Sequence, residues 1–281
     1  MANEAQAAAW DGPAGERWVK RQRALDGAYG PHGLAAVDAA DLRPGDSVLD
    51  VGCGTGALSL EAARRVGPRG LVVGLDISRS MLALARSRAA AEPELRTRFE
   101  HADAQLAPLG EGRFDRMISR LGVMFFDDPV AAFDNVRRAV RKGGRLACAV
   151  WQSEQENPWI HLPERAAKGL LEIPAAPTGL GPGPFSFADP DVVRRHLTGA
   201  GLVRVDVAPL LCDVRFAGTA AEVAVLVSEF ALLGRAMMTA DADTRARVHE
   251  VVSRALEPFV MRDAVVMPSR AWLVTATRGS E

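Results

Sequence analysis

The chain has 281 residues, of which 48% are hydrophobic and 25% charged, and its formal net charge is −1. This length suits one large α/β domain with insertions, or such a domain with a small cap. This net charge gives no general electrostatic case for a nucleic-acid partner, which would need a basic face, so we expect none.

The cysteines and the apolar runs indicate where the protein resides. Cys53, Cys148 and Cys212 fit neither a disulfide framework nor a zinc site, which favours a reducing compartment. The first residues lack the pattern of a signal peptide, and no apolar run approaches the ~20 residues of a transmembrane helix. We therefore expect a cytoplasmic protein without stable membrane insertion.

The first 44 residues are expected to form helices. Residues 4–28 favour a helix that is interrupted at residues 11–15, and residues 31–40 favour a second helix. These helices could pack on the edge of a sheet or cover a bound ligand as a lid, and both interpretations stay open.

The central feature of the chain is a glycine-rich turn between a strand and a helix. Residues 47–51 read as a short apolar strand, Gly52, Gly54 and Gly56 follow it, and residues 57–65 favour a helix. Glycine lets a ligand approach the backbone, and the helix N-terminus presents free N–H groups to that ligand. Together they predict the nucleotide side of a doubly wound sheet.

The spacing around this turn separates two kinds of cofactor. The third glycine comes one residue earlier than in the dinucleotide motif G-x-G-x-x-G, and Asp50 precedes the first glycine. A second predicted strand, residues 70–76, ends in Asp76. This pattern resembles the class I S-adenosylmethionine (SAM)-dependent methyltransferases. We expect the Asp76 carboxylate to accept both ribose hydroxyls, because Ser78 fills the alternative role of helix N-cap better.

The resemblance extends to the third and fourth strands, at residues 98–105 and 114–119. It implies that Asp103 accepts the adenine amine; the alternative is a solvated loop residue. Arg120 could flank the methionine arm of the cofactor, or pair with Asp127 or Asp128. The expected SAM-binding residues are Asp50, Gly52, Cys53, Gly54, Gly56, Asp76, Ile77, Met81, Asp103, Ala104, Ser119, Arg120 and Leu121.

A helix at residues 130–141 and a fifth strand at residues 145–151 complete the pattern. It most resembles the branch that includes ubiquinone/menaquinone methyltransferases and bacterial small-molecule methyltransferases. We expect an α/β fold with a Rossmann-like, doubly wound, seven-stranded sheet, an antiparallel last strand and helical cap insertions. The expected organisation is N-terminal helices (1–44), SAM-binding core (45–151), lid (152–188), further core (189–216), helical cap (217–265) and last strand (266–281).

The two insertions are expected at the same end of the sheet, above the crevice. Phe185 and Phe187 beside a Pro/Gly-rich run favour a docked lid over a disordered connector. Met237 and Met238 could line a pocket there, or belong to an ordinary core.

The resemblance implies a SAM-dependent methyltransferase that acts at O, C or N of a small, fairly apolar metabolite, polyketide-, phenol- or quinone-like. The alternatives are a C-methyltransferase of ubiquinone/menaquinone biosynthesis and a SAM-binding protein without methyl transfer, structural or cyclase-like. Where the acceptor needs a general base, His161 and His32 are the candidates, and Glu156 is less well placed. We expect no metal, and the chain could form a homodimer.

Overall fold

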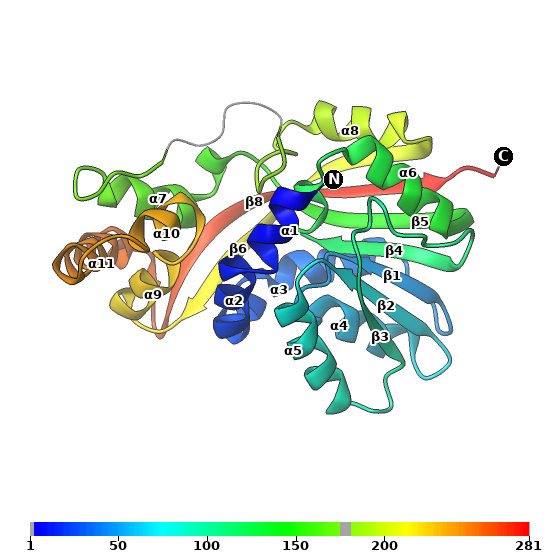
Figure 1. The fold of residues 1–281 in the computed structure, drawn as a ribbon, viewed down its shortest axis with the longest axis horizontal. Coiled ribbons are helices and arrows are strands. Elements are labelled where there is room, and N and C mark those ends of the chain that lie inside the picture. Colours follow the sequence, from blue (N-terminus) through cyan, green and yellow to red (C-terminus); the bar gives the residue numbers. More distant parts are fainter. Residues whose placement is uncertain (1–2, 175–180, 281) are drawn as a thin grey trace.

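The computed structural model describes residues 3–174 and 181–280 of the chain, and its strands form one eight-stranded sheet (Figure 1). Seven strands follow the order β3 (Thr97–His101), β2 (Leu71–Asp76), β1 (Ser47–Val51), β4 (Phe114–Arg120), β5 (Val140–Trp151), β8 (Ala264–Arg278) and β6 (Leu202–Ala217). β1 to β5 are parallel, and β8 runs antiparallel between β5 and β6. The predicted doubly wound sheet with an antiparallel last strand is confirmed. A short eighth strand, β7 (Val260–Met261), pairs with β8 and was not predicted.

Helices cover both faces of this sheet (Figure 1). On one face lie α3 (Gln22–Ala39), α4 (Ala57–Val66) and α5 (Arg79–Ala90), and on the other α6 (Pro129–Ala139) and α8 (Pro190–Gly199). The sequence marks where α6 and α8 begin, because Asp128 and Asp189 each accept a backbone hydrogen bond at the N-cap and a proline follows each.

Each face of the sheet has its own hydrophobic core. Leu49 and Met117 belong to the cluster that contains Phe133 of α6, whereas Val48 and Ile118 belong to the cluster on the α4 side. All five side chains are at most 1% exposed. β1 is therefore buried on both faces, as expected of a central parallel strand, and its end is held rigidly.

The N-terminal residues form three helices, α1 (Glu4–Trp10), α2 (Pro13–Lys20) and α3. The prediction of a helix that begins at Pro31 is wrong, because α3 runs without a break through this proline. Pro31 donates no hydrogen bond to residue 27, which is a glycine. The buried side chains of Leu25, Tyr29 and Ala36 pack α3 against the sheet and compensate for the missing bond.

The second half of the chain builds a helical cap on an extension of the sheet. The ladder between β5 and β8 covers only residues 271–277 of β8, so its first half projects beyond the parallel strands with β6. The cap consists of α7 (Pro158–Ala167), α9 (Ala220–Val227), α10 (Ala231–Met237) and α11 (Ala242–Leu256). α7 contacts the other three helices, and Figure 1 shows all four around the projecting ribbon. None of the helices in the described part of the chain has the length and apolar character needed to cross a bilayer.

Candidate active site

A cavity of about 640 Å³ opens at the carboxyl ends of β1, β2 and β4. At one end it is lined by residues of the glycine-rich turn and of the loops after β2, β3 and β4. Eleven of the thirteen expected SAM-binding residues line this cofactor end: Asp50, Gly52, Cys53, Gly54, Asp76, Ile77, Met81, Asp103, Ala104, Arg120 and Leu121. The structure therefore brings these residues together around one space.

Two glycines of the turn shape this end of the cavity. Gly52 has φ +67°, and a Cβ there would lie 2.8 Å from the Cα of Gly122. Gly54 has φ +55°, and the atom its Cβ would meet is the flexible end of Met81, at 2.8 Å. Gly52 is thus required by the fold, whereas Gly54 keeps the cavity open.

The two other expected residues do not line the cavity. A Cβ on Gly56 would lie 3.0 Å from Ala85 and 3.1 Å from Phe99, so this glycine packs the turn against α5 and β3. Ser119 is fully buried, and its hydroxyl donates to the carbonyl of Val51 at 2.7 Å. Both residues therefore lie outside the cavity and hold the segments that line it in place.

Asp76 joins the end of β2 to the glycine-rich turn. Its Oδ2 accepts the backbone N–H of Gly54 at 2.7 Å, and its Oδ1 accepts that of Ser78 at 2.9 Å. Burial raises the pKa of this carboxyl, although the backbone donors oppose the shift. Each oxygen retains a lone pair toward the cavity, so the carboxylate can still accept two hydroxyl donors.

Asp50 is a completely buried carboxylate whose hydrogen bonding is incomplete. Ser59 donates to its Oδ2 at 2.5 Å, while its Oδ1 has no hydrogen-bond partner in the described part of the chain. Burial raises the pKa of Asp50 to about 7. A buried carboxylate oxygen without a partner, at the wall of a cavity, is suited to a cationic ligand group.

Arg120 extends from the end of β4 toward α3. Its Nη2 lies 3.3 Å from Asp26 Oδ1, and its side chain is 10% exposed. The alternative pairing with Asp127 or Asp128 is wrong, since Asp128 caps α6 instead. Arg120 reaches the cavity from a fixed position, because α3 holds its guanidinium group.

Beside Asp103 the cavity is closed by Asn3, the residue that precedes α1. The Nδ2 of Asn3 donates to both carboxylate oxygens of Asp103, at 3.1 and 3.2 Å, and its Oδ1 accepts the backbone N–H of Asp127 at 2.9 Å. Asn3 is 6% exposed. Sequence reasoning did not single it out, since these contacts span at least 100 residues.

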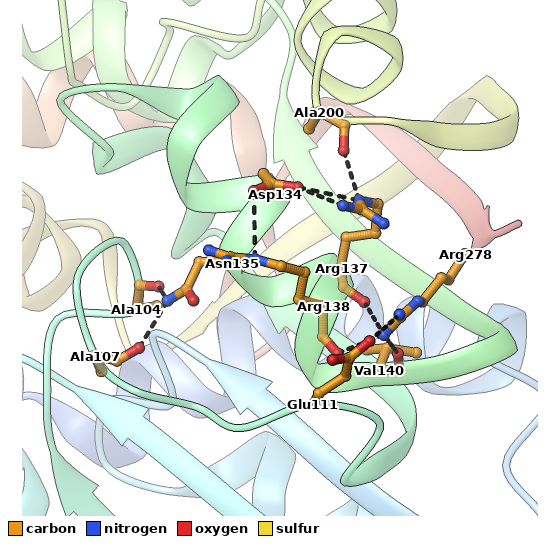
Figure 2. Close-up of polar contacts among 10 residues, drawn as sticks. All are labelled: Ala104, Ala107, Glu111, Asp134, Asn135, Arg137, Arg138, Val140, Ala200 and Arg278. Atoms are coloured by element: carbon orange, nitrogen blue, oxygen red, sulfur yellow. Dashed lines mark hydrogen bonds and ion pairs between the residues drawn. The ribbon is translucent and has the colours of Figure 1, made fainter. Parts of the chain in front are cut away.

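The loop that carries Ala104 is held by α6. Asn135 donates from Nδ2 to the carbonyls of Ala104 and Ala107, each at 2.8 Å (Figure 2). Figure 2 also shows Arg278 of β8 binding the carbonyls of Arg138 and Val140 at the end of α6. The helix is thus fixed at one end by β8, and with it the loop that faces the cavity.

Nine aromatic rings line the cavity: Trp10, Trp18, Tyr29, Phe125, Phe126, Trp151, Trp159, Phe185 and Phe230. They come from the N-terminal helices, the loop after β4, the end of β5, the 152–188 segment and the cap. Tyr29, Trp159 and Phe230 also line, with Glu164, a small adjoining pocket that none of the expected SAM-binding residues reaches, and we call this part the aromatic end. Such a lining favours an apolar ligand of the size of one or two rings.

The two insertions contribute unequally to the lining of the cavity. Phe185 lines the cavity, whereas Phe187 is 1% exposed and stacks on Phe133. Met237 is buried outside the cavity, and Met238 is 61% exposed. Residues 175–180 of the expected lid lie outside the described residues.

The candidate bases do not line the cavity. His32 is fully buried with Nε2 2.8 Å from Ser269 Oγ, and burial lowers its pKa to about 4. Neither His32, His161 nor Glu156 is among the residues that line the cavity. Two acids that sequence reasoning missed, Glu154 and Glu164, do line it. Glu154 stands in the polar run at residues 152–157, which does not mark it out, and Glu164 is one acid on a helix of mixed character.

Comparison with known proteins agrees with this geometry. Residues 48–144 match a family described as a methyltransferase domain. An uncharacterised protein of Mycobacterium tuberculosis is 37% identical over 124 residues, 44% of each chain. The demethylmenaquinone methyltransferase of Shouchella clausii is 33% identical over 108 residues, 38% of this chain and 46% of that one. The chain thus spans less than half the length of these relatives.

Among solved structures, the YcgJ protein of Bacillus subtilis aligns with a TM-score of 0.58 over 90% of this chain and 99% of its own, at 16% identity. This likeness concerns the fold alone. Residues 48–144 are thus similar to a methyltransferase domain, and the sheet order and the glycine-rich turn agree with this match. The family match ends at residue 144 and does not include the cap.

The cofactor end fits SAM, the methyl donor of this family. The unpartnered Oδ1 of Asp50 matches the need of a cationic amino group, and Asp76 can accept the two ribose hydroxyls. Gly54 leaves room at the backbone, and Asp103 and Ala104 line the same cavity.

Proposed function

We propose that the protein transfers the methyl group of SAM to O, C or N of a small, fairly apolar metabolite. The observation that carries this proposal is the continuity of the cavity. One space is lined by Asp50 and Asp76 at its cofactor end, and by Trp18, Trp159 and Phe230 at its aromatic end. A donor and an apolar acceptor can therefore meet without crossing bulk water.

The protein's main contribution to this chemistry is to position the reactants. When bound, SAM supplies a methyl group on a sulfonium sulfur, and the acceptor can displace the thioether without a protein nucleophile. Asp76 and the glycine-rich turn orient the nucleoside, and Asp50 holds a cationic group. The aromatic walls orient the acceptor and exclude water, which is where most of the acceleration of a direct displacement arises. A base is needed for a hydroxyl acceptor and dispensable for a neutral amine.

Quinone C-methylation is the second candidate. The likeness to a demethylmenaquinone methyltransferase favours it. That likeness covers 108 residues, 38% of this chain, and the acceptor site is built mainly by the N-terminal helices and the cap. A prenylated quinol therefore belongs in the acceptor panel as one class among several.

Turnover tests the proposal directly. The protein is incubated with methyl-labelled SAM and a panel of phenols, polyketide-like ketones, arylamines and prenylated quinols, and label transfer is measured together with S-adenosylhomocysteine (SAH). We expect SAH to form only with an acceptor, and the Asp76→Ala variant to lose this turnover. SAM binding without SAH formation across the panel would contradict the proposal and favour a SAM-binding protein without methyl transfer.

A further inference from the structure

Two glutamates face the aromatic end of the cavity, away from the residues that fit SAM. Glu154 lies on the short helix η2 (Glu154–Glu156), Glu164 lies on α7, and both line the cavity. The backbone N–H of Leu232 donates to Glu164 Oε1 at 3.2 Å, which fixes the carboxylate between α7 and α10. In the described part of the chain neither glutamate has an ion pair, and the pair of this segment joins Glu156 to Arg270.

The carboxylate of Glu164 is held in an unfavourable electrostatic setting. Burial raises its pKa, and the negative charge of Glu154 raises it further. Two like charges near one partly buried space repel each other unless a positive group neutralises them. The cavity thus offers a place where a cation would relieve both charges at once.

Aromatic rings surround this place. Tyr29, Trp159 and Phe230 line the large cavity and, together with Glu164, a second pocket of about 10 Å³. The ring centroids of Tyr29 and Trp159 are 5.4 Å apart, and those of Trp18 and Phe230 are 6.3 Å apart. Aromatic faces attract organic cations and reject anions.

We propose that the acceptor of this site is an apolar molecule that carries a protonated amine, held by Glu164 and Glu154 among Trp18, Tyr29, Trp159 and Phe230. This inference rests on the proposed function and names its substrate class. The ammonium group anchors the molecule and is not the methylated atom, because it has no free electron pair. A nucleophilic atom elsewhere in the molecule would take the methyl group, with SAH as the leaving group and any proton of that atom released to water.

A hydroxyl or an anion would suit this arrangement less well. A hydroxyl donates one hydrogen bond to one carboxylate and leaves the charge of the other uncompensated. An anion would have to rely on Arg17, Arg120 and Arg235, which also line the cavity, and Arg120 is already paired with Asp26 at 3.3 Å. Arg17 is directed at the sulfur of Met238, 3.7 Å away, and Arg235 is exposed.

The test compares three probes of nearly equal shape. Naphthylmethylamine, naphthylmethanol and naphthoate are titrated calorimetrically into the full-length protein saturated with SAH, near neutral pH. We expect the amine to bind about ten-fold more tightly than the alcohol, and the carboxylate most weakly. Glu164→Gln should weaken the amine about ten-fold and leave the alcohol within about two-fold, and Glu154→Gln should act in the same direction.

A control variant and a prior titration with SAH distinguish failure of this inference from failure of the proposed function. Glu156→Gln removes a carboxylate of the same segment outside the cavity, and it should leave all three affinities unchanged. Equal affinities for amine and alcohol, or a preference for naphthoate, would overturn the inference while SAH still binds. Failure of SAH itself to bind would instead count against the proposed function.

Discussion

Arg21 and Glu229 form a bidentate ion pair that joins the N-terminal helices to the cap. Arg21 Nε donates to Glu229 Oε2 at 2.8 Å, and its Nη2 donates to the other carboxylate oxygen. Both side chains are about three-quarters buried, and Trp18 packs edge-on against Phe230 beside them. The aromatic end of the cavity is therefore closed by a contact between segments some 200 residues apart.

Breaking this pair should loosen the cap. A double-mutant cycle of Arg21→Met and Glu229→Gln should give a coupling free energy of about 1–2 kcal/mol in urea unfolding at neutral pH. Burial alone would raise the pKa of Glu229, but the hydrogen bond and charge of Arg21 lower it. The coupling is therefore present at neutral pH, and it should be lost as the pH falls below the ordinary glutamate pKa and through the lowered pKa of the folded protein. The exposed pair of Arg254 and Glu250 is the control, with a coupling below about 0.5 kcal/mol.

Asp76 should control the affinity for the nucleoside part of the cofactor. Replacing it with Ala removes one to two charge-assisted hydrogen bonds to the ribose, roughly 1.5–3 kcal/mol each, so SAM and SAH should weaken by similar factors. Calorimetric titration measures both. Unchanged affinity in a folded variant would remove Asp76 from the cofactor site.

SAM binding should depend on pH through Asp50. Its pKa is about 7 in the folded protein and about 4 in the unfolded chain, so the ligand-free protein should lose stability as the pH rises from about 4 to 7. A cationic ligand group favours the ionised carboxylate, so SAM affinity should rise over the same range up to about pH 7.

Titration in two buffers of different ionisation enthalpy should reveal roughly half a proton released per SAM at pH 7, given a pKa of about 7. Asp50→Asn should bind SAM more weakly and release no proton. Proton release that persists in this variant would assign the titration to another group, with Asp76 the nearest candidate.

Asn135 should affect the affinity for the cofactor indirectly, through the loop that it holds. Asn135→Ala loses two hydrogen bonds to the loop at residues 104–107, which should lower the free energy of unfolding by about 1–2 kcal/mol. Because the loop then samples other conformations, SAH and adenosine should both bind about three- to ten-fold more weakly.

Arg137→Ala is the matched control on the same helix (Figure 2). It loses the bond to the Ala200 carbonyl at 2.8 Å and should cost stability without changing adenosine affinity. Equal losses of affinity in the two variants would show that Asn135 acts through general stability rather than through the loop.

The cofactor end could be predicted because its signals are local. A strand, a glycine turn and a helix follow one another within 20 residues, and parallel strands bring Asp50 and Asp76 to one edge. The direction in which Gly56 and Ser119 face could not be predicted, because it depends on packing against Phe99 and on a bond to Val51.

The acceptor end could not be predicted, because distant segments build it. Glu164 reaches the cavity through α7, and its partner Leu232 is 68 residues away. The aromatic lining joins helices from both ends of the chain, and no pattern in the sequence records that pairing. The histidines were singled out for their usual chemistry, whereas burial takes His32 out of the cavity.

The most direct measurement is calorimetric titration of the protein with SAM and SAH, with NAD as the control ligand. We expect micromolar binding of SAM and SAH, weaker binding of both in Asp76→Ala, and no binding of NAD. Binding of NAD without SAM would contradict it, because the glycine-rich turn would then serve a dinucleotide and the methyltransferase assignment would fall.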